Sequence, residues 1–502
     1  MTQLRPLSII SFHSFPFMHW LIFYLGDYVR NSNKKMNFSR QWHEECGVVG
    51  TYTEDLDAVN VAAFALYALQ HRGQESAGVA SSDGDCIQVQ TGMGLINQSF
   101  KDIDLELMRG NIAIAHTRYS TTGSNRIDNA QPILSSNDGN EIALAHNGNL
   151  VNARELRQEL IQRGIKFTSS NDSEVIAHFI TTAPGVTLAE RLKYCMQRLQ
   201  GAYSLALMTK SALIAIRDPR GVRPLCIGKL KDGWVVASES CALDHVGAKL
   251  VRDVKPGEAV QLGATGIETI YQHVSIEKPA LCVFEHIYFA RPDSIIEDKL
   301  VHEARVSMGV ELAKEHPVDA DMVVGVPDSA SPAATGYAQQ SGIPYGDALV
   351  KNRYVGRTFI LPDQRERELG VRRKLNPMSS LVQGKRLVVV DDSIVRGTTT
   401  PPVVRLLKDA GATEVHLRIC APPIQWPCHY GVDMATRDEL IAADKTPEEV
   451  NSIIGSDSLG YLSIPGLLRA VKGDKKSYCM ACFTGDYPIP VQIEMNKLAM
   501  EI

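Results

Sequence analysis

Cys46 combines a nucleophilic side chain with an unusual place in the chain. It follows two acids and opens a small apolar run punctuated by glycines, Cys-Gly-Val-Val-Gly. A thiolate can attack an acyl carbon, whereas an ordinary buried cysteine packs as a small hydrophobic residue. The residues before Cys46 differ in pattern from the rest of the chain, so sequence typical of a globular domain begins at this cysteine. Its position favours a nucleophile, with core packing or metal ligation as alternatives.

Two further polar clusters follow predicted strands at residues 111–115 and 141–145. Arg118 in the first cluster suits a planar carboxylate through paired hydrogen bonds. Asn147 and Gly148 in the second could supply a side-chain and a backbone N–H, which are the donors of an oxyanion hole. The alternative interpretation of Asn-Gly is a hairpin turn.

Asp172 opens a helix-like segment after a run of serines and an asparagine, where helix capping is the alternative to substrate binding. Upstream, residues 57–70 carry apolar side chains at helical spacing, among them Phe64, which predicts a helix. The polar loop of residues 71–78 follows that helix and is either functional or a solvated turn.

Asp391 and Asp392 follow a predicted buried strand, residues 386–390, and precede a glycine and hydroxyl loop that enters a helix. Paired acids can hold ribose hydroxyls or a hydrated divalent cation. Loop amides, hydroxyls and a helix N-terminus suit a phosphate. The alternative is a chance strand-to-helix turn. Ser329 lies in another loop after a predicted parallel strand, where open α/β sheets place their ligands.

Lys351, Arg353 and Tyr354 open a basic run that continues to Lys374. One interpretation is a solvated basic surface. The functional interpretation is a mobile lid that closes over a phosphorylated substrate and excludes water; the resemblance given below implies that this substrate carries pyrophosphate on a ribosyl centre.

Four of the ten cysteines form a possible ligand set. The Cys479-x-x-Cys482 pair alone could bind zinc, perform redox chemistry or do neither, and Cys282 and Cys428 are isolated in sequence. Four converging thiolates suit zinc or an iron–sulfur cluster, and spacing does not choose between them. The remaining candidates are interpreted as packing residues: Cys86, Cys195, Cys226, Cys241 and Cys420.

The elements expected around these residues divide the chain into two fold classes. Short strands with few long helices dominate the first half, which predicts a β-rich α+β sandwich. From residue 321 onward, apolar strands alternate with helices, which predicts an α/β domain with a parallel sheet covered on both faces. We place the two domains at residues 46–277 and 278–502, the second including a cysteine-containing tail.

Composition narrows the class of protein. The 502 residues suffice for about two to four domains, and 44% hydrophobic with 22% charged residues is ordinary for a soluble enzyme. A net charge of −5 gives no footprint for nucleic acid. The cysteines are too few and scattered for a secreted disulfide scaffold, which favours a reducing compartment such as the cytoplasm.

The N-terminal segment has a different character. The apolar run at residues 15–25 is short for a bilayer, and no clear signal-peptide cleavage site follows. We interpret residues 1–35 as an extension from an upstream start-site assignment, with targeting or membrane attachment and a disordered extension as alternatives. A start at Met36 leaves residues 36–45 as a short polar leader.

The first half resembles the class II glutamine amidotransferases through five motifs in matching order: CGVVG, HRGQESAG, HTRYSTTG, HNGNL and SSNDSE. The resemblance implies an N-terminal-nucleophile fold in which Cys46 becomes residue one after leader removal, so that its own α-amine acts as base. It also implies oxyanion stabilisation by Asn147 and Gly148. The implied glutamine-binding residues are His116, Thr117, Arg118 and Asp172.

The second half resembles the type I phosphoribosyltransferases through the run VVVDDSIVRGTTT. This implies Mg²⁺ near Ser329, Asp391 and Asp392. The implied residues for phosphoribosyl pyrophosphate (PRPP) are Lys351, Arg353, Tyr354, Asp391, Asp392, Ser393, Val395, Arg396, Gly397, Thr398 and Thr399.

From about residue 44 to 490 the chain resembles the glutamine PRPP amidotransferases. Their iron–sulfur branch implies a [4Fe–4S] cluster on the four cysteines Cys282, Cys428, Cys479 and Cys482. The resemblance further implies an ammonia channel between the sites, purine nucleotide inhibitors, a homotetramer, and no nucleic-acid or membrane partner.

Two rival functions make different demands on the second half. A glucosamine-6-phosphate synthase shares the first half but needs sugar-isomerase repeats, which VVVDDSIVRGTTT argues against. A non-enzymatic PRPP-sensing regulator predicts a helix-turn-helix module and has no need for the four cysteines.

Overall fold

The structure is a computed structural model of the chain and describes residues 46–55, 57–102, 105–119, 124–274, 278–352, 374–432, 434, 436–474, 477–491 and 500. Residues 1–35 and the predicted leader, residues 36–45, lie outside the described residues. So do Arg353, Tyr354 and most of the predicted lid. Among the residues that are described, no helix combines the length and hydropathy needed to cross a membrane.

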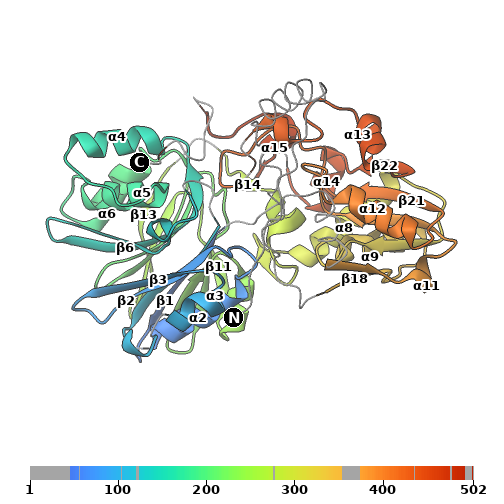
Figure 1. Ribbon diagram of the computed structural model, residues 1–502. Helices are drawn as coiled ribbons and strands as arrows, with labels where there is room; N and C mark the ends of the chain where they lie inside the picture. Colours follow the sequence, from blue (N-terminus) through green and yellow to red (C-terminus); the bar gives the residue numbers. More distant parts are fainter. Residues whose placement is uncertain are drawn as a thin grey trace, which may run out of the picture.

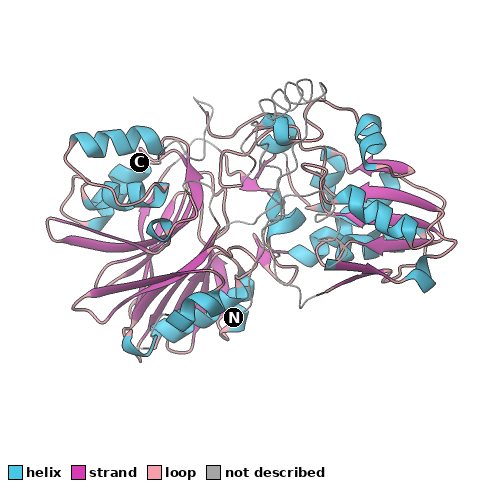
Figure 2. Ribbon diagram, in the orientation of Figure 1, coloured by secondary structure: helices cyan, strands magenta, loops and turns pink. Residues whose placement is uncertain are grey.

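The first domain is a sandwich of two antiparallel sheets with helices on both outer faces (Figures 1 and 2). The seven-stranded sheet has the order β11 (Lys249–Asp253), β9 (Cys226–Leu230), β10 (Gly233–Ala237), β1 (Gly47–Thr53), β4 (Ile112–Arg118), β2 (Ser76–Ser82) and β3 (Ile87–Met93). The six-stranded sheet has the order β13 (Gly266–Gln272), β12 (Glu258–Gly263), β8 (Leu213–Arg217), β7 (Gly201–Met208), β6 (Asn140–Leu150) and β5 (Ile133–Asn137).

Alternating side chains build the core between the two sheets. Small and branched residues such as Val48 and Ala145 face inward and are fully buried, because successive side chains of a strand point to opposite faces. One outer face is covered by α2 (Ala58–Ala68), α3 (Ile96–Asp102) and α7 (Ser240–His245), and the other by α4 (Ala153–Gln162), α5 (Asp172–Thr181) and α6 (Leu188–Met196). The predicted α+β sandwich is confirmed.

The second domain contains a parallel sheet of order β17 (Met322–Gly325), β20 (Arg386–Asp391), β21 (Glu414–Ile419) and β22 (Ser458–Tyr461). Apolar clusters lie on both faces of this sheet, which explains the uninterrupted apolar run in β20. Its main helices are α8 (Val301–Glu315), α9 (Ser331–Ser341), α12 (Thr400–Asp409), α13 (Pro447–Ile454) and α14 (Ile464–Ala470). The predicted α/β domain is confirmed (Figure 2).

Short elements join the domains and complete the second one. The sandwich ends with β13, and β14 (Leu281–Cys282) starts the next domain by pairing in parallel with β23 (Tyr478–Cys479). A π-helix, Glu285–Phe289, follows β14. The other short elements are β15 (Ile295–Ile296), β16 (Lys299–Leu300), β18 (Leu349–Lys351), β19 (Leu375–Pro377), α11 (Ser379–Val382) and α15 (Ala481–Thr484).

Candidate active sites

Cys46 is held immediately before β1, at the edge of the sandwich core. Its side chain is buried, and its Sγ donates to the carbonyl oxygen of Tyr119 at 3.4 Å. Burial raises the pKa of the thiol to about 11, and the positive charge of Arg118 only partly opposes this. The thiol is therefore neutral at pH 7 in this environment, and attack on an acyl carbon requires a base beside it.

Asn147 and Gly148 lie within β6 rather than in a turn after it, so the alternative hairpin turn is wrong. The strand continues to Leu150, and Asn147 and Gly148 pair with Ser204 and Tyr203 of β7. The side chain of Asn147 is 1% exposed, and its Nδ2 has no hydrogen-bond partner among the described residues. A buried N–H without a partner is costly, so this donor is free to stabilise an oxyanion.

Arg118 and Asp172 place charges of opposite sign near the Cys46 thiol. Arg118 ends β4 and lies 3.8 Å from Glu75, and its charge lowers the pKa of Cys46, whereas that of Asp172 raises it. Asp172 accepts from the backbone N–H of Leu150 at 2.9 Å. Both side chains are almost fully buried. Such a pair suits the carboxylate and ammonium of an amino acid.

The capping alternative for Asp172 is wrong, because a neighbouring residue performs that role. Asn171 is the N-cap of α5, and its side-chain oxygen accepts from the N–H of Glu174 at 2.8 Å. The Asp172 carboxylate is therefore not needed to close the helix end.

His116 and Thr117 have fully buried side chains that bond to neighbouring backbone. His116 Nε2 donates to the carbonyl of His146 at 3.0 Å, and burial lowers the pKa of the imidazole to about 3, so the ring is neutral. Thr117 Oγ1 donates to the carbonyl of Gly73 at 2.8 Å. The structure thus places both side chains in the framework that connects the two sheets and the loop after α2.

Arg72 was missed from the candidate residues, although its loop was noted. It is fully buried, and its Nε donates to the carbonyl of Cys46 at 3.2 Å. It also forms ion pairs with Glu239 and with Glu285, the latter at 2.8 Å. An arginine directly after a predicted helix was the only available signal, because its partners are distant in sequence.

The second site lies at the carboxyl ends of β17 and β20, as the strand order predicts. Asp392 is 8% exposed and accepts hydrogen bonds from the hydroxyls of Ser329 at 2.6 Å and Ser393 at 2.5 Å. Burial raises the pKa of both Asp391 and Asp392, and the neighbouring Asp392 charge raises that of Asp391 further. Two adjacent acids of this kind, one buried and one partly buried, suit a bound cation.

The loop after these acids approaches the N-terminus of α12. Val395 accepts from the N–H of Ile441 at 2.7 Å, and Arg396 pairs with Glu439 at 3.0 Å. Gly397 has φ +63°, and a Cβ there would lie 2.4 Å from Ile441 Cδ1, so this turn requires glycine. Thr398 and Thr399 are exposed beside the helix start, a placement that suits a phosphate.

Lys351 is the described member of the predicted basic lid that lies near these acids. It ends β18, and its Nζ pairs with Asp328 at 3.0 Å in the loop that also carries Ser329.

The four candidate cysteine ligands are brought to one region of the second domain. Cys282 and Cys479 face each other across β14 and β23. Burial raises the pKa of both thiols to about 12, and Cys428 adds to the rise in both. Burial also raises the pKa of Cys482, with contributions from the other three. None of the four is in a disulfide.

Over the described ranges, no group of three or more His, Cys, Asp or Glu side chains is positioned to hold a metal ion. The thiols nevertheless have suitable surroundings for a larger inorganic group. Phe284 and Phe483 belong to the surrounding apolar cluster, and the N–H of Tyr430 donates to Cys428 Sγ at 3.4 Å. Hydrogen bonds to ligand sulfur and apolar shielding are characteristic surroundings of iron–sulfur clusters.

The expected packing cysteines divide into two groups. Cys195, Cys226, Cys241 and Cys420 are buried as predicted. Cys86 is exposed because it precedes β3 in a turn, where Asp83 accepts from its N–H, so the packing prediction for this residue is wrong.

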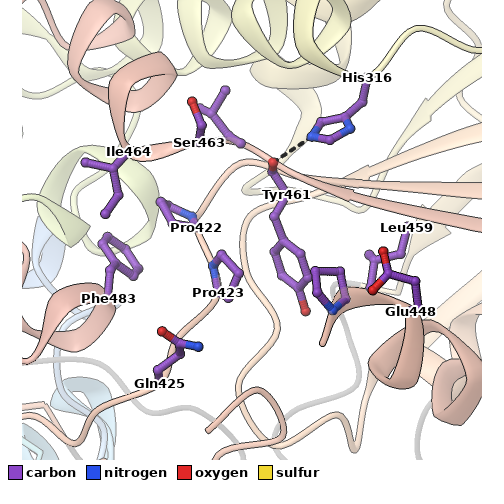
Figure 3. A pocket seen from close by; sticks show the side chains of 12 residues that line it. His316, Pro422, Pro423, Gln425, Glu448, Leu459, Tyr461, Ser463, Ile464 and Phe483 are labelled. Atoms are coloured by element: carbon purple, nitrogen blue, oxygen red, sulfur yellow. Dashed lines mark hydrogen bonds between the residues drawn. The ribbon is translucent and has the colours of Figure 1, made fainter. Parts of the chain in front are cut away.

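A separate pocket of about 520 Å³ lies beyond the carboxyl ends of β21 and β22 (Figure 3). Prolines, Tyr461 and Phe483 form much of its wall, and His316 Nε2 donates to the carbonyl of Tyr461 at 2.8 Å. None of the predicted site residues lines it, so its volume does not mark either candidate site.

Comparisons with known proteins agree with this two-site arrangement. Residues 116–245 match the glutamine amidotransferase domain family, and residues 309–426 match the phosphoribosyl transferase domain family. The curated amidophosphoribosyltransferase of Archaeoglobus fulgidus is 50% identical over 454 residues, covering 89% of this chain and 98% of its own. That of Synechococcus elongatus is 48% identical over 466 residues, covering 91% and 94%.

The chain is also similar to a solved structure over most of its length. It is described as glutamine phosphoribosylpyrophosphate amidotransferase from B. subtilis complexed with ADP and GMP. The two chains are 46% identical, with a TM-score of 0.83 and coverage of 89% of this chain and 98% of the other.

The two sites and their folds define a class of enzyme, a glutamine amidotransferase joined to a phosphoribosyltransferase. Identity near 50% over nine-tenths of the chain narrows the class further. The chain belongs to the amidophosphoribosyltransferase family.

Proposed function

We propose that Cys46 and the Asp391–Asp392 pair carry the two halves of one reaction. The chain is a glutamine-dependent amidophosphoribosyltransferase, which converts PRPP, glutamine and water to 5-phosphoribosylamine, glutamate and pyrophosphate. This is the first committed step of purine biosynthesis. The observation that carries the division of labour is the buried, unpartnered Asn147 Nδ2 in the domain of Cys46, because an amide substrate generates an oxyanion.

In the first half-reaction, the Cys46 thiolate attacks the side-chain amide carbon of glutamine. Asn147 Nδ2 and the Gly148 N–H stabilise the oxyanion, and collapse of the tetrahedral intermediate releases ammonia and leaves a thioester. Water then attacks the thioester and gives glutamate and the free thiol. Arg118 binds the α-carboxylate of glutamine and Asp172 its α-ammonium, while His116 and Thr117 support the strand that carries Arg118.

The base for Cys46 is its own α-amine, exposed when residues 36–45 are removed. A base is needed because burial raises the pKa of the Cys46 thiol to about 11. An α-amine has an ordinary pKa of about 8 and can accept the thiol proton near neutral pH. His116 is unsuited to this role, because burial lowers its pKa to about 3 and it already bonds to His146.

In the second half-reaction, ammonia displaces pyrophosphate from C1 of PRPP. Ser329, Asp391 and Asp392 would hold Mg²⁺, which neutralises charge on the pyrophosphate leaving group. Two adjacent carboxylates with raised pKa values, of which Asp392 is buried and Asp391 partly buried, support this assignment. Residues 393 and 395–399 would bind the ribose 5-phosphate, and Lys351, Arg353 and Tyr354 are proposed to bind the pyrophosphate.

A [4Fe–4S] cluster on Cys282, Cys428, Cys479 and Cys482 is the best candidate for the cysteine region. The apolar surroundings and the N–H donated to Cys428 Sγ support a cluster. When bound, the cluster would act as a structural link, because the four ligands come from distant parts of the chain.

Purine nucleotides are proposed as inhibitors, because the B. subtilis relative was solved in complex with ADP and GMP. A homotetramer in the cytoplasm and an ammonia channel beneath the lid complete the proposal.

The test is pyrophosphate release from PRPP by purified enzyme, with glutamine or ammonium chloride as nitrogen donor. We expect Mg²⁺-dependent release with both donors, and glutamate formation only with glutamine. Failure of an iron-replete enzyme that starts at Cys46 to release pyrophosphate with either donor would refute the function.

A further inference from the structure

The segment between Cys428 and Gly431 packs directly behind the strand that carries the oxyanion donors. Asn149 is buried two residues after Asn147 on β6, and its Nδ2 donates to the carbonyl of His429 at 3.0 Å. This hydrogen bond joins the glutaminase domain to the residue that follows a candidate cluster ligand.

Gly431 makes the closest approach to the same strand. A Cβ at Gly431 would lie 3.1 Å from the carbonyl carbon of Gly148 and 3.2 Å from its oxygen. Gly431 also has φ +110°, a conformation that side chains rarely adopt. Backbone from the second domain therefore lies in contact with the residue proposed to donate the second oxyanion hydrogen bond.

Arg223 also holds this segment in place. Its Nε and Nη2 donate to the carbonyl of Tyr430 at 3.1 and 2.8 Å. The carbonyl of Arg223 accepts from Ser204 Oγ at 3.0 Å, and Ser204 is the β7 partner of Asn147. The segment is thus connected to both strands that determine where Asn147 and Gly148 lie.

We propose that Asn149 and Gly431 are positioning residues for the glutaminase reaction, and that they hold the oxyanion donors of β6 against the segment of residues 428–431. Gly148 has φ +146°, and a Cβ there would lie 2.0 Å from the carbonyl oxygen of Ala202, so its backbone is tightly constrained. Oxyanion donors act only at short distances from the developing charge. A displacement of about 1 Å in such a site costs about 100-fold in rate.

This inference rests on the proposed roles of Asn147 and Gly148 and makes a separate kinetic prediction. Loosening the contact should lower kcat with glutamine and leave the KM for glutamine nearly unchanged, because Arg118 and Asp172 still bind the substrate. Activity with ammonia bypasses the oxyanion and should remain. A general structural role would lower both activities together.

Asn149→Ala tests the hydrogen bond to the segment. We expect kcat with glutamine to fall about 10- to 100-fold, with ammonia-dependent activity within about twofold of the unaltered enzyme. Asn152→Ala is the matched control, because Asn152 Nδ2 also donates to a backbone carbonyl, that of Arg198 at 2.9 Å, but within its own domain. Equal glutamine-dependent rates for both variants would overturn the proposal.

Gly431→Ala tests the close backbone contact, with Gly266→Ala as control. Gly266 has a closely similar positive φ of +108° but open space around its Cβ position, so it imposes a similar φ without the contact. We expect only Gly431→Ala to lose glutamine-dependent kcat selectively, with unchanged iron content and melting temperature. Equal loss of glutamine- and ammonia-dependent activity, or loss only together with iron, would assign the segment a structural role and overturn positioning.

The failure of this inference differs from failure of the function. If the unaltered enzyme uses both nitrogen donors and Asn149→Ala matches it, only the inference fails. If the unaltered enzyme releases no pyrophosphate, the proposed function fails.

Discussion

Arg72 and Glu285 form a fully buried ion pair, 2.8 Å long, between the two domains. The same guanidinium donates to the backbone carbonyl of Cys46 at 3.2 Å. Removing one partner of a buried pair leaves an uncompensated charge and is strongly destabilising. The backbone of the nucleophile is therefore tied to the first residues of the second domain through one side chain.

Glu239 is the second carboxylate that pairs with Arg72, and its ionisation makes the free energy of unfolding depend on pH in the acid range. Burial acts to raise the pKa of Glu239, but the charges of His71 and Arg72 hold this pKa below its ordinary value of 4.5. A depressed pKa in the folded state contributes stability above pH 4.5, and this is lost as the pH falls through the folded-state value. Glu239→Gln should therefore lower the melting temperature at pH 7, with a difference that narrows below pH 4.5.

Differential scanning calorimetry at several pH values measures this difference. Replacement of a buried carboxylate that pairs with Arg72 is expected to cost about 3 kcal/mol at pH 7. Glu141→Gln provides the control. Glu141 pairs with the half-exposed Lys210, with 3.4 Å between Oε2 and Nζ, and exposed pairs of this kind contribute about 0–1 kcal/mol. A melting-temperature difference for Glu239→Gln that stays constant as the pH is lowered from 7 to about 2 contradicts the prediction.

Cys46→Ala should lower glutamine-dependent activity at least about 1,000-fold, because the covalent route is lost. Ammonia-dependent activity should persist, since the second site is unaltered. The measurement is pyrophosphate release with each donor. Cys195→Ala, which removes a buried thiol from the face of α6 that packs on the sandwich, should retain the ratio of the two activities. Glutamine-dependent turnover by Cys46→Ala would disprove the nucleophile.

Asp392→Asn should lower pyrophosphate release with both nitrogen donors, because cation binding serves the step that they share. Loss of several kcal/mol of charge stabilisation corresponds to a rate decrease of at least about 100-fold. Chelation of Mg²⁺ should have the same effect on the unaltered enzyme and should be reversible. Asp319→Asn, at an exposed pair with Arg386, is the control. Selective loss with glutamine alone would place Asp392 outside the PRPP site.

Cys428→Ser should remove most of the bound iron and the visible absorbance of a [4Fe–4S] cluster, because serine is a poor cluster ligand. Iron analysis and absorbance spectra of anaerobically purified protein provide the measurement. Cys226→Ser is the matched control, since its thiol is buried in the sandwich and lies far along the chain from the four ligands. Equal iron content in both variants would exclude Cys428 as a ligand.

Local patterns predicted the elements better than their buried faces. The helix expected at residues 57–70 is α2, Ala58–Ala68, and the acids follow a strand as expected. Phe64, one of the apolar residues whose spacing predicted that helix, is 59% exposed, while Ala62 and Leu66 are buried. Apolar spacing identifies a helix, but alanine-rich helices offer more than one possible face, and only the tertiary partner selects it.

Contacts between distant residues could not be predicted from the sequence. The continuation of β6 through Asn147 and Gly148 depends on β7, whose pairing overrides the local turn preference of Asn-Gly. Likewise, the function of Arg72 becomes visible only when Glu239 and Glu285 reach it. Motif order identified the candidate reacting groups, whereas the residues that support them come from pairings that no local pattern contains.

The pairing of Cys282 with Cys479 across β14 and β23 also orders events during synthesis. During translation, the sandwich and the first strand of the second domain emerge from the ribosome long before Tyr478–Cys479 is synthesised. Cys479 and Cys482 are therefore the last two of the four thiols to be synthesised. Cys282 is synthesised much earlier, before most of the second domain is translated. A chain that stops before Tyr478–Cys479 therefore lacks two of the four proposed ligands, so the proposed cluster could be completed only late in synthesis.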